Sequence, residues 1–165
     1  MRRIALGVAF AATMLAGGAH ADDWSWLSFS KVNQSMAGHF RVEVGVGRRD
    51  GRGIWIAKRV EQPAEKGAQE QTTWAASDTC PAMMPAFAKL TSIEPFTIVP
   101  PGFPHEGAST ADGAIFRVHV LGYWAQANHD GEILLSGNYG TPVADWVQET
   151  MKALAPCWSE QRPGA

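Results

Sequence analysis

The C-terminal part of the chain shows a clear helical pattern. Apolar side chains recur at the spacing of one helix face, and charged or amide side chains lie between them. That face comprises Val143, Trp146, Val147, Thr150, Met151 and Leu154. Thr141 offers a capping hydroxyl, Pro142 suits the first helical position, and Pro156 ends the pattern. We therefore predict a helix from Thr141–Pro142 to just before Pro156.

A second pattern, alternation with period two, predicts a hairpin in the first half. Residues 40–46 alternate between apolar side chains and polar ones or glycine, as in a strand that buries one face. Residues 54–60 read as the returning strand, and Asp50-Gly51 between them is a pair that tight turns favour.

The segments flanking this hairpin carry weaker patterns. Residues 22–37 contain a short alternating run of aromatic and apolar side chains, which we interpret as an N-terminal arm held against the domain. Residues 61–71 have no aromatic or branched apolar side chain and are predicted to form a solvated loop. Residues 72–76, around Trp74, are predicted to form a strand.

A helix and three more strands are predicted after residue 76. Polar caps at 77–79 precede an apolar stripe, so we expect a helix from about Pro81 to Ser92, with Pro85 either kinking it or moving its start. Residues 96–99 form a short predicted strand closed by two prolines, and residues 114–127 a long one. A turn at 128–131 leads to a returning strand at 132–136.

This order of elements predicts an α+β fold. A mainly antiparallel sheet of five or six strands, with both helices on one face, would bury both apolar helix stripes. Cys80 lies at the start of one predicted helix and Cys157 at the end of the other, so antiparallel helices would bring them together. A disulfide would then link the two helices.

The N-terminus and the charge balance indicate the compartment. Arg2 and Arg3 precede an apolar run too short to cross a bilayer, and Ala19-His20-Ala21 fits a signal-peptidase site. We predict a signal peptide at 1–21, a single domain at 22–165, and a periplasmic or secreted protein without a stable membrane span. That domain holds 12 Lys and Arg against 16 Asp and Glu, which does not suggest nucleic-acid binding. Two cysteines in an exported chain are most simply one disulfide.

The arginine-rich hairpin tip is the first candidate binding site. Arg48, Arg49 and Arg52 could grip a carboxylate or phosphate of an acidic protein, a cell-wall component or a lipid headgroup. The alternative, which we favour, is a solvated turn, because surface arginines without a visible partner contribute little.

A second candidate is the proline-rich loop at 100–112. Phe103 lies between prolines and His105 follows, which is typical of an exposed recognition loop, although a plain connecting loop is slightly favoured. His105 and Glu106 are adjacent and lack a metal-ligand spacing, so we predict no metal site and no cofactor.

Histidine, tryptophan and glycine supply the remaining candidates. His119, with His129 and Asp130 nearby, could be a general base, but no nucleophile motif accompanies it. Trp124 is the tryptophan we expect to be exposed and available for ligand stacking, whereas Trp146 and either Trp55 or Trp74 are expected in the core. The glycine-rich segment 136–140 is interpreted as a turn rather than an anion site.

Two short motifs carry a resemblance. Thr79-Cys80-Pro81-Ala82, and residues 142–147 through Ala155-Pro156-Cys157-Trp158, resemble small exported bacterial proteins of uncharacterised families. In those proteins a Cys-Pro helix start and a Cys-Trp helix end occur together. The resemblance covers the chain from about Trp74 onward, supports the disulfide pairing, and implies no activity.

The leading functional hypothesis is a non-enzymatic exported domain that binds a protein or cell-envelope component, of the inhibitor or immunity type. It rests on the lack of a catalytic signature and on polar loops carried by a rigid scaffold. The alternatives are an envelope hydrolase that uses His119 or His105 with a carboxylate, and a small-molecule or lipid carrier. The hydrolase requires a pocket that gathers a histidine and a carboxylate, and the carrier requires a cavity between sheet and helices.

Overall fold

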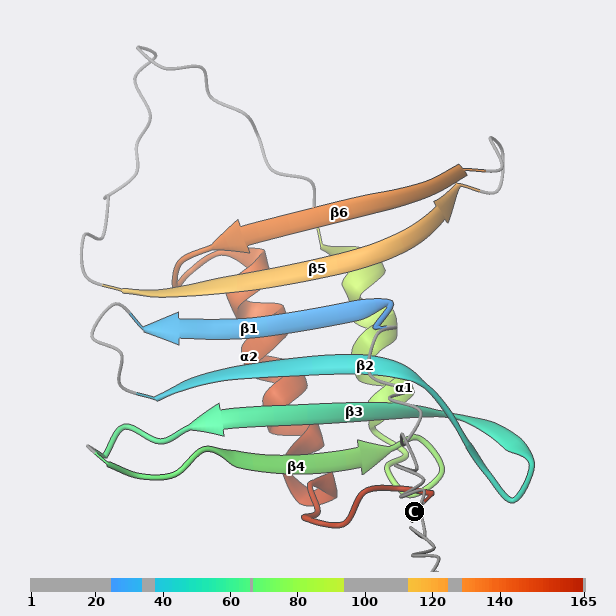
Figure 1. Cartoon of the computed structure of the whole chain (residues 1–165). Coiled ribbons are helices and arrows are strands. Elements are labelled where there is room, and N and C mark those ends of the chain that lie inside the picture. The colour runs from blue at the N-terminus through green and yellow to red at the C-terminus, as the bar shows by residue number, and fades with distance from the viewer. Residues whose placement is uncertain (1–24, 34–37, 66, 94–112, 125–128, 165) are drawn as a thin grey trace, which may run out of the picture.

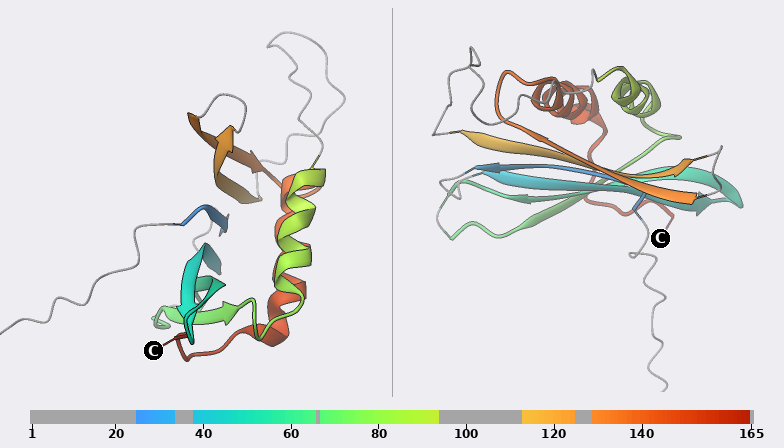
Figure 2. Two further views of the ribbon diagram at one scale, coloured as in Figure 1. Left: turned by 90° about the vertical axis from the view of Figure 1, so that its right-hand side faces the viewer. Right: turned by 90° about the horizontal axis from the view of Figure 1, so that it is seen from above.

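Six antiparallel strands form one sheet in the order β4-β3-β2-β1-β5-β6, and two helices pack on one of its faces (Figures 1 and 2). The computed structural model describes residues 25–33, 38–65, 67–93, 113–124 and 129–164. The strands are β1 (Leu27–Asn33), β2 (His39–Arg49), β3 (Arg52–Gln62), β4 (Gln71–Ala76), β5 (Ala114–Trp124) and β6 (His129–Gly137). The helices are α1 (Met83–Ala88), continued by the 3-10 turn η2 (Lys89–Ser92), and α2 (Pro142–Leu154), continued by η3 (Ala155–Cys157). The predicted α+β fold is confirmed.

The segment interpreted as an N-terminal arm is instead the central strand β1. It pairs antiparallel with β2 on one side and with β5 on the other. Leu27 and Phe29 are almost fully buried, while Ser28 and Ser30, which alternate with them, face the other side of the sheet. The interpretation was wrong because four of the seven residues of this strand are polar, so its apolar signal rests on few positions.

The predicted β2–β3 hairpin is confirmed and is longer than expected, with eleven residues in each strand. Its turn residues Asp50 and Gly51 both have positive φ, 51° and 77°. A two-residue turn of this kind matches the right-handed twist of the flanking strands.

Both predicted helices are present. The Thr141 hydroxyl accepts a hydrogen bond from the Ala144 backbone N–H at 3.3 Å, as an N-cap does. Pro85 lies in the first turn of α1, where no intrahelical N–H bond is needed, so the proline moves the helix start. The Trp146 indole N–H donates to the Ala86 carbonyl at 3.2 Å and ties α2 to α1.

The core lies between the sheet and the helices. Phe29 contacts Trp146 and Phe87 edge-on, with ring centroids 5.2 and 6.5 Å apart. The largest fully buried side chains around them are Phe116, Leu27, Met83, Leu154, Val42, Val44, Val118, Val143 and Val147. Trp146 is buried as predicted, and Trp55 is partly buried against the core.

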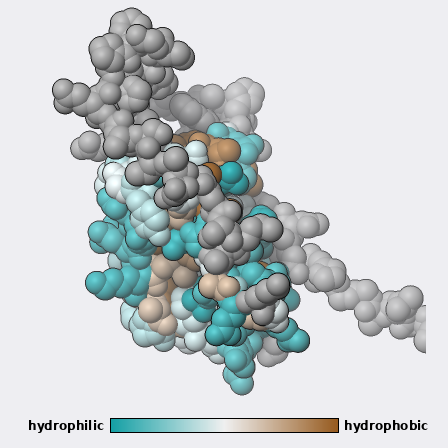
Figure 3. All heavy atoms as spheres, turned by 90° about the vertical axis from the view of Figure 1, so that its left-hand side faces the viewer, coloured by the Kyte–Doolittle hydropathy of each residue, from teal (hydrophilic) through white to brown (hydrophobic). Residues whose placement is uncertain are grey.

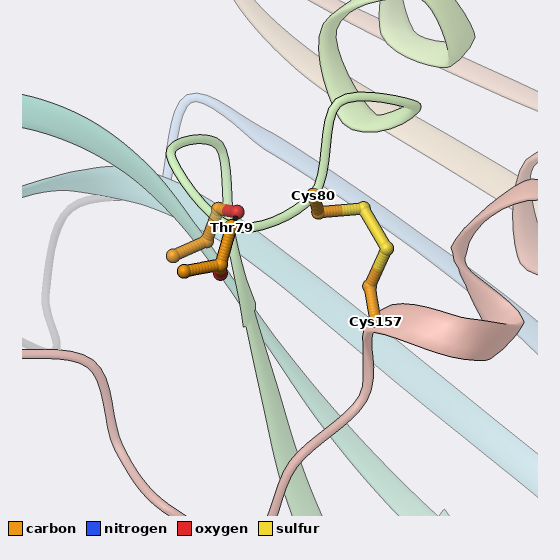
Figure 4. Close-up of a disulfide and its surroundings, with 4 residues drawn as sticks. Thr79, Cys80 and Cys157 are labelled. Carbon is orange, nitrogen blue, oxygen red and sulfur yellow. Dashed lines mark hydrogen bonds between the residues drawn. A yellow bond between two sulfur atoms is a disulfide. The ribbon is translucent and has the colours of Figure 1, made fainter.

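The predicted disulfide joins the start of α1 to the end of α2 (Figure 4). The two helices run antiparallel across the strands (Figure 1), and the Cys80 and Cys157 Cα atoms are 5.5 Å apart. This distance is typical of a disulfide. The bond therefore links the two helices, as expected, and it fits a protein of an oxidising compartment.

After the disulfide, the C-terminal tail runs along the edge strand β4. Trp74 and Ser159 form a two-bond antiparallel bridge, with N···O distances of 2.7 and 2.9 Å. The Arg162 guanidinium lies 5.1 Å from the centre of the Trp74 ring. One edge of the sheet is thus partly covered by the chain itself.

Candidate functional site

The helices leave one face of the sheet uncovered by helix (Figure 2), and this open face carries polar side chains. In β1, β2 and β5 the buried positions alternate with positions on this open face, and the pairing of the strands aligns the latter into rows. One row contains Lys58, Glu43, Ser28, His119 and Leu134. The next contains Val60, Arg41, Ser30, Arg117 and Ser136. These rows bring polar side chains from five strands together.

A groove of about 670 Å³ lies over these rows. Its lining includes Arg41 and Arg117, which flank Ser30 from the two neighbouring strands. Adjacent strands are about 4.8 Å apart, so the Cα atoms of the two arginines are about 10 Å apart. In the end-on view of Figure 3, hydrophilic residues lie along both outer sides of the molecule, with hydrophobic ones between them.

Ion pairs neutralise part of this surface. Arg41 Nη2 is 2.8 Å from Glu43 Oε1, two residues along the same strand. Arg117 is exposed and forms no ion pair with any residue that the structure describes. The Lys58 ammonium lies 5.7 Å from the centre of the Trp74 ring, and it too lacks a carboxylate partner in the described ranges. These two cations are available to an anionic group of a ligand.

His119 and Glu132 form the other polar contact of the groove. His119 Nε2 lies 2.7 Å from Glu132 Oε1, which is within ion-pair distance if the imidazole is protonated. The two groups are not aligned as a hydrogen bond, and Nε2 is buried without another hydrogen-bond partner among the described residues. The contact places a carboxylate oxygen beside one nitrogen of the imidazole ring. Ser28 lies directly opposite His119 in the register of β1 and β5.

The three arginines predicted as a binding site at the hairpin tip differ in their surroundings. Arg48 and Arg52 are exposed, and Arg52 lies opposite Arg49 in the register of β2 and β3. Arg49 Nη1 is 2.7 Å from Asp78 Oδ2, so this guanidinium holds the tip to the segment before α1. Two of the three arginines can therefore meet a partner.

The other predicted site residues are not placed. Phe103 and His105, with Glu106, lie outside the described residues. Trp124 ends β5, but its side chain lies outside the described part, as do the side chains of His129 and Asp130. Their proposed roles stay predictions.

Sequence reasoning missed most of the groove. It singled out His119, but not its contact with Glu132, nor Ser28, Arg41 and Arg117. The period-two alternation along β5 places Arg117 and His119 on the same face of the strand. What the pattern could not supply was the insertion of β1 between β2 and β5, which brings these residues together.

No group of three or more metal-ligating His, Cys, Asp or Glu side chains occurs within the described ranges. The layer between sheet and helices, where a carrier would need its cavity, is occupied by fully buried side chains such as Phe29, Phe116 and Met83. No helix of the described part has the length and apolar character needed to span a membrane.

Comparison with known proteins adds no functional assignment. No protein-family model, curated protein or solved structure matches this chain.

Proposed function

We propose that the protein is a non-enzymatic exported binding protein, and that the open face of its sheet holds a polar segment of a partner protein that presents a carboxylate. The observation that carries the proposal is Arg117, a cation that is exposed in the groove and has no ion pair among the described residues. Arginine accepts a carboxylate through two parallel hydrogen bonds, which makes it suited to this role.

The neighbours of Arg117 fit the same role. Ser30 lies beside it in the row, and Arg41 lies beyond Ser30. The Ser30 hydroxyl can donate a hydrogen bond to a peptide group or accept one from it. Arg41 adds positive charge to the row, although its guanidinium is already paired with Glu43. The groove lining also contains Glu43, Glu70 and Glu132, so it is electrically mixed. A mixed lining suits a polar peptide segment better than a uniformly acidic polymer.

The charge of the β2–β3 hairpin supports an acidic partner. Six of the 12 lysines and arginines after residue 21 lie between residues 39 and 62, against three acidic residues in the same stretch. Since the chain after residue 21 is acidic as a whole, this hairpin is its basic region. Such asymmetry steers a partner of opposite charge toward one side of the molecule.

Export is part of the proposal. The disulfide supports it, because such bonds persist in oxidising compartments. The predicted signal peptide at 1–21 lies outside the described residues. In the periplasm or outside the cell, the partner would be a protein of the envelope, consistent with an inhibitor or immunity role.

The test is affinity capture from a periplasmic extract, followed by calorimetry with the purified partner. Arg117→Ala should weaken binding at least about tenfold, or 1.4 kcal/mol, as expected for a central arginine of an interface. Lys152→Ala, which removes an exposed cation from α2, is the matched control and should bind like the wild type.

A third variant tests whether the partner contacts the groove or the hairpin tip. Arg48→Ala/Arg52→Ala removes the two exposed tip arginines and leaves the Arg49–Asp78 pair intact. A partner lost by this variant but retained by Arg117→Ala would place the contact on the tip. If the affinity is equal for the wild type, Arg117→Ala and Lys152→Ala, the open face is not the binding surface.

A second candidate function is acyl transfer in the same groove. Ser28, His119 and Glu132 come from the adjacent strands β1, β5 and β6, and the His119–Glu132 distance is 2.7 Å. Ser28 would be the nucleophile, His119 the base and Glu132 the group that orients the ring. Because Nε2 faces the carboxylate, Nδ1 would be the nitrogen that accepts the serine proton.

A fluorophosphonate probe distinguishes this candidate from binding alone. The serine oxygen would attack phosphorus and release fluoride, leaving a stable covalent adduct. Labelling of the wild type that is lost in Ser28→Ala and in His119→Ala would establish the hydrolase. Absence of labelling in the wild type would remove this candidate and leave the binding proposal untouched.

A further inference from the structure

The two edge strands of the sheet, β4 and β6, differ in whether another segment pairs with their outer side. At β4, the C-terminal tail supplies the Trp74–Ser159 bridge. At β6, no residue in the described ranges pairs with the outer side of the strand. An edge strand offers a row of free backbone N–H and C=O groups, and proteins normally protect it with charge, proline or a covering segment.

The residues of β6 provide little of that protection. From residue 131 to 137 the sequence is GEILLSG, with no lysine, arginine or proline. Ile133 is 48% exposed and Leu134 is 65% exposed, so apolar side chains reach solvent on both faces of the strand. Leu121 of β5, 43% exposed, is the diagonal neighbour of Leu134 on the open face. An exposed apolar edge of this kind is typical of a strand that pairs with another strand.

We propose that two copies of the chain associate by antiparallel pairing of β6 with β6, centred on Leu134. In this register Leu134 faces Leu134 of the second copy, and Ile133 faces Leu135. Glu132 faces Ser136, so no like charges meet across the two strands. A strand can pair with its own copy in this way when its charged residue lies away from the two-fold axis and faces a neutral residue of the second copy.

This pairing fixes how the two copies lie relative to each other. Antiparallel pairing of two identical edges places the two-fold axis perpendicular to the sheet. Since each chain carries α1 and α2 on one face of its sheet (Figure 2), both helical layers then lie on one side of the joined sheet and both open faces on the other. The two sheets become one continuous sheet of twelve strands, with the groove residues Glu132 and Leu134 next to the junction.

A second copy fits this edge better than an unrelated strand does. The sequence of β6 alone supplies the apolar pairs of this register. Ile133 of each copy faces Leu135 of the other, and the two Leu134 residues face each other. A foreign strand would have to supply the same alternation in the same register. A segment of the same chain could also cover the edge. The experiments below distinguish a second copy, a foreign strand and such a segment.

The first test is sedimentation equilibrium of the purified protein with its disulfide intact, over a range of concentrations. A concentration-dependent rise to twice the mass of the single chain is expected. Ile133→Lys should abolish it, because two lysines would lie near the two-fold axis in place of apolar pairs. Val46→Lys is the matched control, since Val46 is also 48% exposed but lies in β2, and it should dimerise like the wild type.

The second test does not depend on the lysine variants folding. Cys80 and Cys157 are bonded, so Leu134→Cys introduces a single thiol that would face its own copy across the axis. Mild oxidation should give a covalent dimer, whereas Val46→Cys should give little.

Two results overturn the proposal: a single-chain mass at every concentration, and equal cross-linking of the two cysteine variants. If the protein is a monomer, hydrogen exchange of the β6 amides identifies the other occupant. Amides protected in the protein alone would show that a segment of the same chain covers the edge, and amides protected only when a captured partner is added would show a foreign strand.

Discussion

Truncation of Phe29 tests the assignment of β1 as the central strand. The side chain is 1% exposed and meets the rings of Trp146 and Phe87 edge-on, so Phe29→Ala removes a core ring and leaves a cavity beneath both helices. Burial of a phenylalanine contributes about 1.5–3 kcal/mol. The two ring contacts add about 0.5–1.5 kcal/mol each. Their sum agrees with the loss of about 3–5 kcal/mol measured for Phe→Ala in protein cores.

Urea denaturation followed by tryptophan fluorescence, with the disulfide intact, measures this loss. The matched control is Ser28→Ala, on the neighbouring residue of the same strand but on the open face, which should change the free energy of unfolding by less than about 0.5 kcal/mol. A peripheral arm would make both substitutions nearly neutral. A loss below about 1 kcal/mol for Phe29→Ala would refute the central position of β1.

Three further substitutions test the disulfide, the helix cap and the turn. Cys80→Ala/Cys157→Ala opens a loop of 77 residues, and the chain-entropy model predicts a loss of up to about 4.5 kcal/mol in the same urea assay; an unchanged midpoint would contradict a structural role. Thr141→Ala removes the N-cap of α2 and should cost about 1 kcal/mol, seen as a lower urea midpoint with an unchanged slope. Gly51→Ala places a side chain at φ 77° and should cost about 1 kcal/mol or more in thermal unfolding, whereas Gly53→Ala, outside the two central turn positions, should cost less.

The elements that depend on local sequence were predictable. The face of α2 and its cap at Thr141 are encoded within one continuous segment. The same holds for the hairpin, where Asp50-Gly51 fixes the turn and the turn fixes the register of both strands. The disulfide was predictable because two cysteines in a chain with a predicted signal peptide allow one pairing.

The groove was not predictable, because it depends on residues that are distant in the sequence. Arg41 and Arg117 are far apart in the sequence and become neighbours across Ser30 because β1 lies between β2 and β5. A period-two pattern assigns a residue to a face but does not identify the strand on either side of it. Since β1 itself has a weak apolar signal, its central place could not be inferred, and the rows of the open face could not be assembled from single strands.

The central place of β1 also determines how functional variants must be interpreted. Any substitution that weakens β1 pairing separates Arg41 from Arg117, so it lowers stability and binding together. Arg117→Ala differs because its side chain is exposed and forms no ion pair among the described residues, so its removal leaves the core untouched. Loss of binding with an unchanged free energy of unfolding would therefore assign Arg117 to the contact itself. Loss of both would mean that the open face acts only through the integrity of the sheet.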